Sequence, residues 1–278
     1  MRVRNSSRIP QLLPRRLWKA EENLSKNMIY LKNPEQIKKM QRAGRITGEA
    51  LLLAGEAVRE GVSTASLDKI IRNHIEKSGA VPSFLGYGGF PASACISINN
   101  EVIHGIPSPK RFLKEGDIVK IDVGAFIDGF HGDSARTFPV GKISEQAEQL
   151  ITATKDSFFA AVEALKGDNP RIGDIGASVE GHVSKFGFSV VRKYVGHGVG
   201  RDLHEDPSVP NYGTAGRGQR ITRGMVIAIE PMVNVGTGAV RELSDGWTVL
   251  TADNSLSAHY EHTVAMTDEG PLLLTMVE

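Results

Sequence analysis

A pattern that occurs twice constrains this chain more than any other feature of its sequence. In each copy a glycine is followed by five strand-forming residues and a carboxylate, first from Gly116 to Asp122 and then, 108 residues later, from Gly224 to Glu230. Two further matches keep the same order: a glycine seven residues before an aspartate, at Gly61 and Gly167, and a His-Gly pair, at His104 and His197. We infer a duplicated helix–strand unit, which predicts one pseudo-symmetric domain with a shared cleft.

Periodicity and capping residues predict four helices and several strands. Asn33, Pro34 and Gln36 form a helix start, and apolar residues at three- and four-residue steps follow until Gly61. We expect helices over about 34–60, 64–78, 144–165 and 173–186. We expect strands over 95–98, 118–127, 130–140, 188–195, 225–235, 246–251 and 260–267.

Composition excludes several classes of protein. A net charge of +1 gives no global attraction to nucleic acid, and a single cysteine, Cys95, excludes an intrachain disulfide. No apolar run of 18 residues occurs, so we expect no membrane span. These values are typical of a globular enzyme-sized domain.

The first 27 residues differ from the rest in charge. They hold seven Arg and Lys residues against Glu21 and Glu22, with no continuous apolar segment. We expect residues 1–30 to be a basic, disordered extension and residues 31–278 to form a single domain. An organelle transit peptide is an alternative that Pro10 and Pro14 disfavour, and a start at Met28 is another.

A predicted hairpin brings two aspartates together. Asp128-Gly129 is a favoured two-residue turn, so Asp133 should oppose Gly124 and Asp122 should oppose Ala135. Asp122 and Asp133 are then diagonal neighbours on one face, where they repel each other unless a cation lies between them. A solvent-facing polar stripe is the alternative.

Three residues of the second half favour the cation. His197 lies among glycines, Glu230 ends an apolar strand, and Glu261 opens another. An unpaired charge in such a strand is costly. Four carboxylates and one histidine suit a pair of divalent cations better than a structural zinc site.

Long sequence strings carry a family resemblance from about Leu31 to Leu274. They are CISIN (95–99), HGIP (104–107), IDV (121–123), DGFHGD (128–133), GHGVGR (196–201), HE (204–205), EPMV (230–233) and YEHT (260–263). With these strings the chain resembles the type I methionine aminopeptidases. The resemblance implies an α+β catalytic domain of the pita-bread (creatinase/aminopeptidase) fold, with pseudo-two-fold duplicated helix–strand units around a central antiparallel sheet.

The resemblance also implies a dinuclear metal site and a mechanism. Its five ligands would be Asp122, Asp133, His197, Glu230 and Glu261, holding two divalent ions whose identity (Co, Mn, Fe or Zn) the sequence leaves open. Glu230 would also transfer a proton, His204 would stabilise the developing oxyanion, and His104 would orient the amide of the second residue.

Further positions are implied by the same resemblance. The methionine pocket would be lined by Phe84, Tyr87, Phe90, Cys95, Leu203 and Trp247, although Phe84, Phe90 and Leu203 stand where relatives can carry cysteine, tyrosine and phenylalanine. Asn99 and Ser257 match positions that help some relatives to hold a monovalent cation. No ligand or pocket position precedes Phe84, so we expect a chain lacking residues 1–27 to stay active.

The implied function is metal-dependent removal of the N-terminal methionine from nascent proteins whose second residue is small and uncharged. An X-Pro aminopeptidase or prolidase is one alternative, and a non-catalytic ribosome-associated binding module of this fold is another. We expect a cytoplasmic monomer that acts on nascent N-termini near the ribosome exit, without sequence-specific nucleic acid binding and without a membrane.

Overall fold

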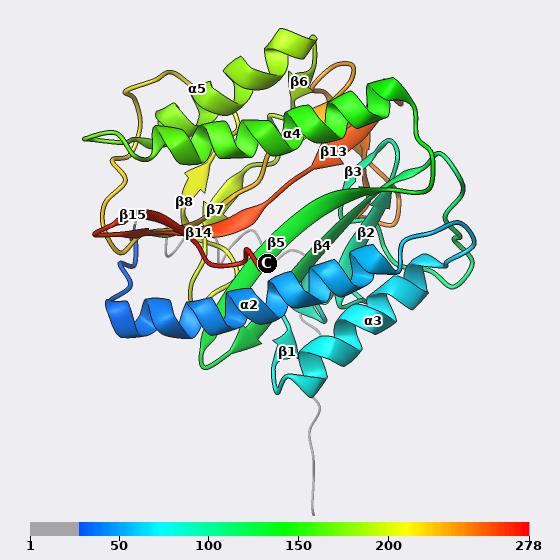
Figure 1. The fold of residues 1–278 in the computed structure, drawn as a ribbon, viewed down its shortest axis with the longest axis horizontal. Helices are drawn as coiled ribbons and strands as arrows, with labels where there is room; N and C mark the ends of the chain where they lie inside the picture. Colours follow the sequence, from blue (N-terminus) through cyan, green and yellow to red (C-terminus); the bar gives the residue numbers. More distant parts are fainter. Residues whose placement is uncertain (1–27, 278) are drawn as a thin grey trace, which may run out of the picture.

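The computed structural model describes residues 28–277, in which four α-helices flank antiparallel strands (Figure 1). The helices are α2 (Pro34–Glu56), α3 (Thr64–Lys77), α4 (Glu145–Ala164) and α5 (Ile172–Val183). The strands of the first half are β1 (Val81–Pro82), β2 (Ala94–Ile98), β3 (Glu101–Ile103), β4 (Ile118–Ile127) and β5 (Phe130–Pro139). Those of the second half are β6 (Ser189–Val190), β7 (Gly196–Gly198), β8 (Glu205–Val209), β9 (Val226–Ile229), β10 (Met232–Asn234), β11 (Val240–Glu242), β12 (Val249–Thr251), β13 (Ser257–His259), β14 (His262–Thr267) and β15 (Gly270–Leu273). Single 3-10 turns lie at Tyr87–Gly89 and Ser184–Phe186.

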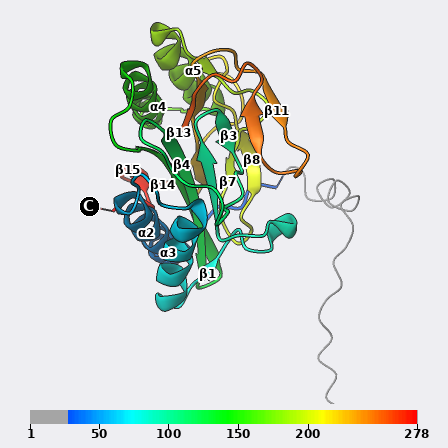
Figure 2. The same cartoon turned by 90° about the vertical axis from the view of Figure 1, so that its right-hand side faces the viewer.

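The duplicated architecture is confirmed by two helix pairs, each packed on its own strands. Helices α2 and α3 pack on β4, β5 and β2, whereas α4 and α5 pack on β13, β10, β6 and β8. Figure 2 shows α2, α3 and α4 on one side of the strands, with β8 and β11 on the other. The strands pair in the orders β1-β4-β2 with β5 beside β4, β15-β14-β9-β7-β8, β13-β10-β6 and β11-β12-β3.

Backbone hydrogen bonds join the two halves where β5 runs past the segment between β13 and β14. Glu261 N–H donates to the Ala135 carbonyl at 2.8 Å, and Ala135 N–H donates to the Glu261 carbonyl at 3.3 Å. The Ser134 hydroxyl also donates to the Glu261 carbonyl, at 2.7 Å. One carboxylate of the second half is therefore fixed beside the strand that carries Asp133.

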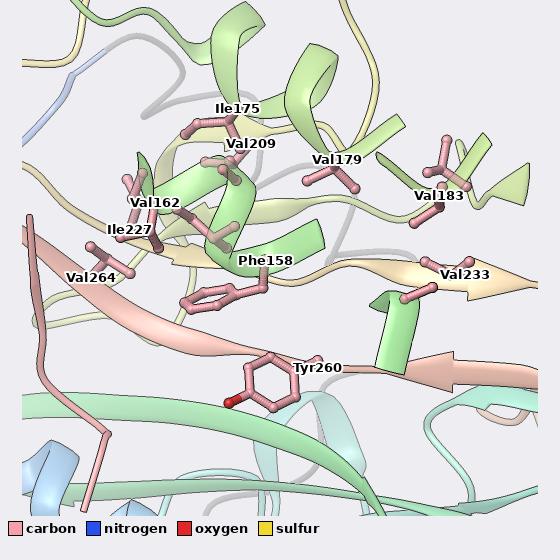
Figure 3. Close-up of a cluster of buried hydrophobic side chains, with 14 of the residues drawn as sticks. Phe158, Val162, Ile175, Val179, Val183, Val209, Ile227, Val233, Tyr260 and Val264 are labelled. Carbon is pink, nitrogen blue, oxygen red and sulfur yellow. The ribbon is translucent and has the colours of Figure 1, made fainter. Parts of the chain in front are cut away.

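The larger hydrophobic core supports this junction from the α4 side (Figure 3). Phe158 of α4 is fully buried, and its ring centroid lies 5.4 Å from that of Tyr260 and 5.3 Å from that of His262. Successive side chains of extended backbone point to opposite faces. With Tyr260 and His262 in the core, Glu261 between them is directed to the opposite face, where the cleft lies.

The predicted elements are confirmed in kind, with corrections at their ends. The first helix ends at Glu56 rather than near residue 60, because the N–H of Ala57 bonds back to Ala54 in a tightened last turn. The strand expected over 225–235 is two strands, because Pro231 has no N–H to continue the ladder. The strand expected from 246 starts at Val249, since Asp245 accepts hydrogen bonds from Trp247 and Thr248 in a turn.

Other short strands were not predicted. The 188–195 segment contains only β6, and seven strands (β1, β3, β7, β8, β11, β13 and β15) have no counterpart among the predicted ranges. Strands of two to five residues carry too little alternation to stand out in a sequence. Of the helices within 28–277, none combines the length and apolar character that a membrane span requires.

Two helix glycines give a direct test of the packing between the halves. Gly44 of α2 has no room for a side chain, because an added Cβ would lie 2.2 Å from the carbonyl oxygen of Leu274, in the C-terminal segment. Gly181 of α5 faces open space. We predict that Gly44→Ala lowers the free energy of unfolding by about 2 kcal/mol or more, whereas Gly181→Ala raises it by about 0.5–1 kcal/mol. Urea titration of both variants measures this, and equal effects would contradict the close packing.

Candidate metal centre

The β4–β5 hairpin carries the first two candidate ligands in the predicted register. Gly124 pairs with Asp133 and Asp122 pairs with Ala135, which confirms the expected turn at Asp128-Gly129. Both turn residues have positive φ, 55° and 83°, as a tight two-residue hairpin turn requires. Asp122 and Asp133 therefore lie on one face of the hairpin as diagonal neighbours.

The second half contributes a histidine and two glutamates to the same place. His197 is in β7, Glu230 follows β9, and Glu261 lies between β13 and β14. Nε2 of His197 is 3.7 Å from Oδ2 of Asp133 and 3.6 Å from Oε1 of Glu230. Ligand atoms of Asp133, His197 and Glu261 all lie within 4.8 Å of one another. All five side chains line one cavity of about 710 Å³.

Glycines position His197. An added Cβ at Gly196 would lie 2.3 Å from the carbonyl oxygen of Ala228, and one at Gly198 would lie 2.3 Å from that of Asp206. Strand β7 therefore fits between β8 and β9 only with glycines on both sides of the histidine. His197 Nδ1 bonds to the Gly198 carbonyl at 2.8 Å, so Nδ1 carries the proton and Nε2 is free to bind a metal.

Burial and mutual repulsion make the carboxylates poor anions on their own. Burial raises the pKa of Asp133 to about 7. Burial, followed by the charges of the neighbouring carboxylates, raises the pKa values of Asp122, Glu230 and Glu261 well above the ordinary range. Burial lowers the pKa of His197 to about 4, so its imidazole is neutral at pH 7.

These residues fit divalent cations. Oδ1 of Asp122 and Oδ1 of Asp133 are buried and have no hydrogen-bond partner within residues 28–277. Buried carboxylate oxygens without partners are rare unless an ion satisfies them. Four carboxylates and one neutral imidazole suit Mn²⁺, Fe²⁺, Co²⁺ or Zn²⁺.

His259 is a residue of this centre that the sequence analysis missed. It is 2% exposed, and its Nε2 lies 3.6 Å from Oε2 of Glu230 and 4.0 Å from Oε2 of Glu261. Burial lowers its pKa to about 3, so the imidazole is neutral. Its position two residues before Glu261 puts it on the same face of an extended segment, a signal that could have identified it.

The two predicted non-ligand histidines lie on the cavity wall. The ring centroids of His204 and His197 are 4.1 Å apart, and Nδ1 of His204 lies 2.8 Å from the Tyr87 hydroxyl. His104 has φ +60° and packs edge-on against Tyr194, a cavity residue that the sequence analysis did not identify. Burial lowers the pKa of His104 to about 4 and that of His204 well below its ordinary value.

The six predicted pocket residues line the same cavity as the metal-site side chains. Phe84, Phe90, Cys95 and Leu203 form a buried cluster, and Trp247 packs against it with its ring centroid 5.2 Å from that of Phe90. Burial raises the pKa of the Cys95 thiol well above its ordinary value, so the group is a neutral, apolar wall. Cys95 also pairs with Asp122 across β2 and β4, so the pocket adjoins the metal centre.

One expectation about the cavity is wrong. Met28 and Tyr30 also line it, although no pocket residue was expected before Phe84. This segment is fixed by the buried ion pair of Lys32 with Glu205, at 2.5 Å, and by the bond from Lys32 N–H to the Gly224 carbonyl. The predicted extension overlaps this segment at residues 28–30, and its residues 1–27 lie outside the described part of the chain.

The residues expected at a monovalent cation site are already engaged with the chain itself. The Asn99 carbonyl accepts from Lys120 Nζ at 2.6 Å and from Ser257 N–H at 3.1 Å. The Ser257 hydroxyl donates to the Val233 carbonyl at 3.2 Å. The side-chain nitrogen of Lys120 therefore already contacts the carbonyl oxygen at which a monovalent cation was expected.

Comparisons with known proteins agree with this geometry. Residues 38–268 match metallopeptidase family M24. A methionine aminopeptidase of Clostridium acetobutylicum is 55% identical over 251 residues, which are 90% of this chain and all of the relative. A methionine aminopeptidase structure from Thermotoga maritima superimposes with a TM-score of 0.88 at 41% identity, covering 90% of this chain and all of that one.

The chain therefore belongs to metallopeptidase family M24, within its methionine aminopeptidase branch. It is a hydrolase of the pita-bread fold, as the sequence resemblance implied. The prolidase of Pyrococcus furiosus has the same fold, with a TM-score of 0.69 at 23% identity, but this chain covers only 66% of its length. The similarity of this chain to the prolidase therefore concerns the fold.

Metal binding gives a prediction with a defined pH dependence. Because their raised pKa values leave the buried carboxylates partly protonated, a metal ion must displace protons, and its affinity should rise with pH. We predict that Mn²⁺ at one fixed concentration raises the melting temperature of chelator-treated protein by about 5–10 °C at pH 7.5 and by much less at pH 5.5. Differential scanning calorimetry measures both shifts.

Two variants of the same hairpin control this experiment. Asp133→Asn should lose most of the shift at pH 7.5, whereas Asp128→Asn, at the exposed turn, should retain it. A shift that is equal at both pH values, or retained in Asp133→Asn, would contradict the assignment of Asp133 to the metal centre.

Proposed function

We propose that this protein removes the N-terminal methionine from polypeptides whose second residue is small and uncharged. The observation that carries the proposal is the adjacency of two parts of one cavity: an apolar pocket built on Cys95 and the carboxylates that begin with its strand neighbour Asp122. The shared fold and the names of the most similar relatives support the same activity.

The centre would hold two divalent ions on Asp122, Asp133, His197, Glu230 and Glu261. Such ions would make a water molecule acidic enough to attack near neutral pH and would polarise the peptide carbonyl. Glu230 would transfer the proton of the attacking water to the leaving nitrogen. Its buried position and raised pKa suit a group that must hold a proton and then release it.

The two neutral histidines would orient the substrate. His204, beside His197 and bonded to the Tyr87 hydroxyl, would donate a hydrogen bond to the carbonyl oxygen as charge develops on it. His104, on the same wall, would hold the amide of the second residue. Because burial keeps both imidazoles uncharged, each presents one donor and one acceptor nitrogen rather than two donors.

The pocket would select methionine by its length and flexibility. Phe84, Phe90, Leu203 and Trp247 supply aromatic and aliphatic walls, and a thioether gains from contact with aromatic rings. A charged first side chain would find no partner among these walls. The N-termini of nascent polypeptides are the proposed substrates, with a single copy of the chain sufficient for the site.

The specificity is tested with peptides of the form Met-X-Ser. We predict high kcat/KM for Ala, Gly and Ser at X and a loss on the order of 100-fold for Leu, Lys and Glu. Norleucine in place of methionine should cost about 2- to 12-fold, corresponding to the missing sulfur contacts. Lys-Ala-Ser and Ala-Pro peptides should not be hydrolysed.

The Glu230→Gln protein is the control, since it should lose turnover with every peptide and so exclude a contaminating peptidase. Equal rates across the panel would indicate a general aminopeptidase and contradict the methionine pocket. Preferential cleavage of Ala-Pro would instead favour the X-Pro alternative.

A further inference from the structure

Lys120 is a buried lysine that the proposed peptidase chemistry does not use. Its side chain is 1% exposed and among the largest of the fully buried side chains. Within residues 28–277 its ammonium group has one hydrogen-bond partner, the Asn99 carbonyl at 2.6 Å. A buried ammonium group costs free energy unless hydrogen bonds or opposite charges compensate for the lost water.

The carbonyl that Lys120 contacts is held rigidly. The Asn99 side chain accepts from Ile118 N–H at 3.0 Å and donates to Asp117 at 2.8 Å, while its backbone N–H donates to the Ile118 carbonyl. Asn99 has φ +52°, a conformation that these bonds fix. These bonds orient the Asn99 carbonyl toward Lys120 Nζ without help from a bound ion.

The same carbonyl connects the two halves of the domain behind the metal centre. Lys120 is in β4, two residues before Asp122, and lies between Ser97 of β2 and Thr137 of β5. The second donor to Asn99 is the N–H of Ser257, at the start of β13, which leads to Glu261. A cation at this point thus links the strand that carries Asp122 to the strand that precedes Glu261.

We propose that the side-chain nitrogen of Lys120 takes the place of a free monovalent cation between Asn99 and Ser257. The chain then needs neither Na⁺ nor K⁺ to connect its halves. Burial lowers the pKa of Lys120 to about 7, while the charges of Glu101 and Asp117 favour its charged form and that of Arg111 opposes it. A monovalent ion on the Asn99 carbonyl would collide with the Lys120 nitrogen, which lies 2.6 Å from that oxygen, and would be repelled by its ammonium form. The inference does not depend on which peptide the enzyme cleaves.

Thermal melting in different salts tests the proposal without reference to activity. The full chain is melted at pH 6.0 in KCl, NaCl or choline chloride of equal ionic strength, since choline is too large for the site. We expect the same melting temperature in the three salts, within about 1 °C. A melting temperature several degrees higher in KCl or NaCl than in choline chloride would overturn the proposal.

Two substitutions separate the charge from the volume of the side chain. Lys120→Ser leaves space for an ion, so we expect it to melt about 5 °C or more below the unaltered chain in choline chloride and to recover part of this loss in KCl or NaCl. Lys120→Met fills the space without a charge, and its melting temperature should be lower in all three salts alike. Lys142→Ser, at an exposed position, should not change in any salt.

The results divide plainly. The proposal is supported if KCl or NaCl raises the melting temperature of Lys120→Ser and of no other variant. A Lys120→Ser protein that is unfolded in choline chloride and folds in KCl or NaCl supports it equally. Lys120→Ser that is as stable as the unaltered chain in choline chloride would overturn it. If Lys120→Ser does not fold in any salt, the melting temperatures of the unaltered chain and of Lys120→Met in the three salts decide. A higher value in KCl or NaCl for either protein contradicts the proposal.

Discussion

The structure depends on the repulsion among four carboxylates that face one cavity, three of them buried and one half-buried. Asp122, Asp133, Glu230 and Glu261 come from both halves of the domain. Burial raises the pKa of each, and the charges of neighbouring carboxylates add to this effect at Asp122, Glu230 and Glu261. Without a bound cation, each carboxyl group must either take up a proton or remain charged away from water. Both states cost free energy. Divalent ions remove that cost, so the repulsion that destabilises the metal-free protein makes metal binding favourable.

The duplicated fold brings the carboxylates together because each half supplies a rigid carrier. The β4–β5 hairpin presents two aspartates, and the reciprocal backbone bonds between Ala135 and Glu261 fix Glu261 of the other half beside them. The core around Phe158 keeps Tyr260 and His262 on the far side, which directs Glu261 into the cleft. The apolar wall next to this centre would then select the substrate.

The sequence was sufficient where local rules determine geometry. A two-residue turn at Asp128-Gly129 fixes the register of the hairpin, and a helix cap at Asn33 fixes a helix start, so both were predicted correctly. The repeat drew attention to His197 and Glu230, and the apolar strand after Glu261 drew attention to Glu261. These residues suggested a pair of divalent cations, and the family resemblance then assigned all five ligands. The fold came from the same resemblance.

The sequence could not reveal contacts between distant segments. The approach of Met28 and Tyr30 to the cavity depends on the ion pair of Lys32 with Glu205, which are 173 residues apart. The contact of Lys120 with Asn99 depends on a backbone carbonyl, and carbonyls leave no mark in a sequence. Short strands such as β7 form because β8 and β9 lie on either side, not because their own residues prefer extended backbone.

The most direct test of the account is the location of Mn²⁺ in crystals of the protein, measured by anomalous diffraction at the manganese absorption edge. The account predicts two anomalous peaks in the cleft, both surrounded by Asp122, Asp133, His197, Glu230 and Glu261. Absence of a peak among these side chains in crystals equilibrated with Mn²⁺, or manganese held by other residues, would contradict it.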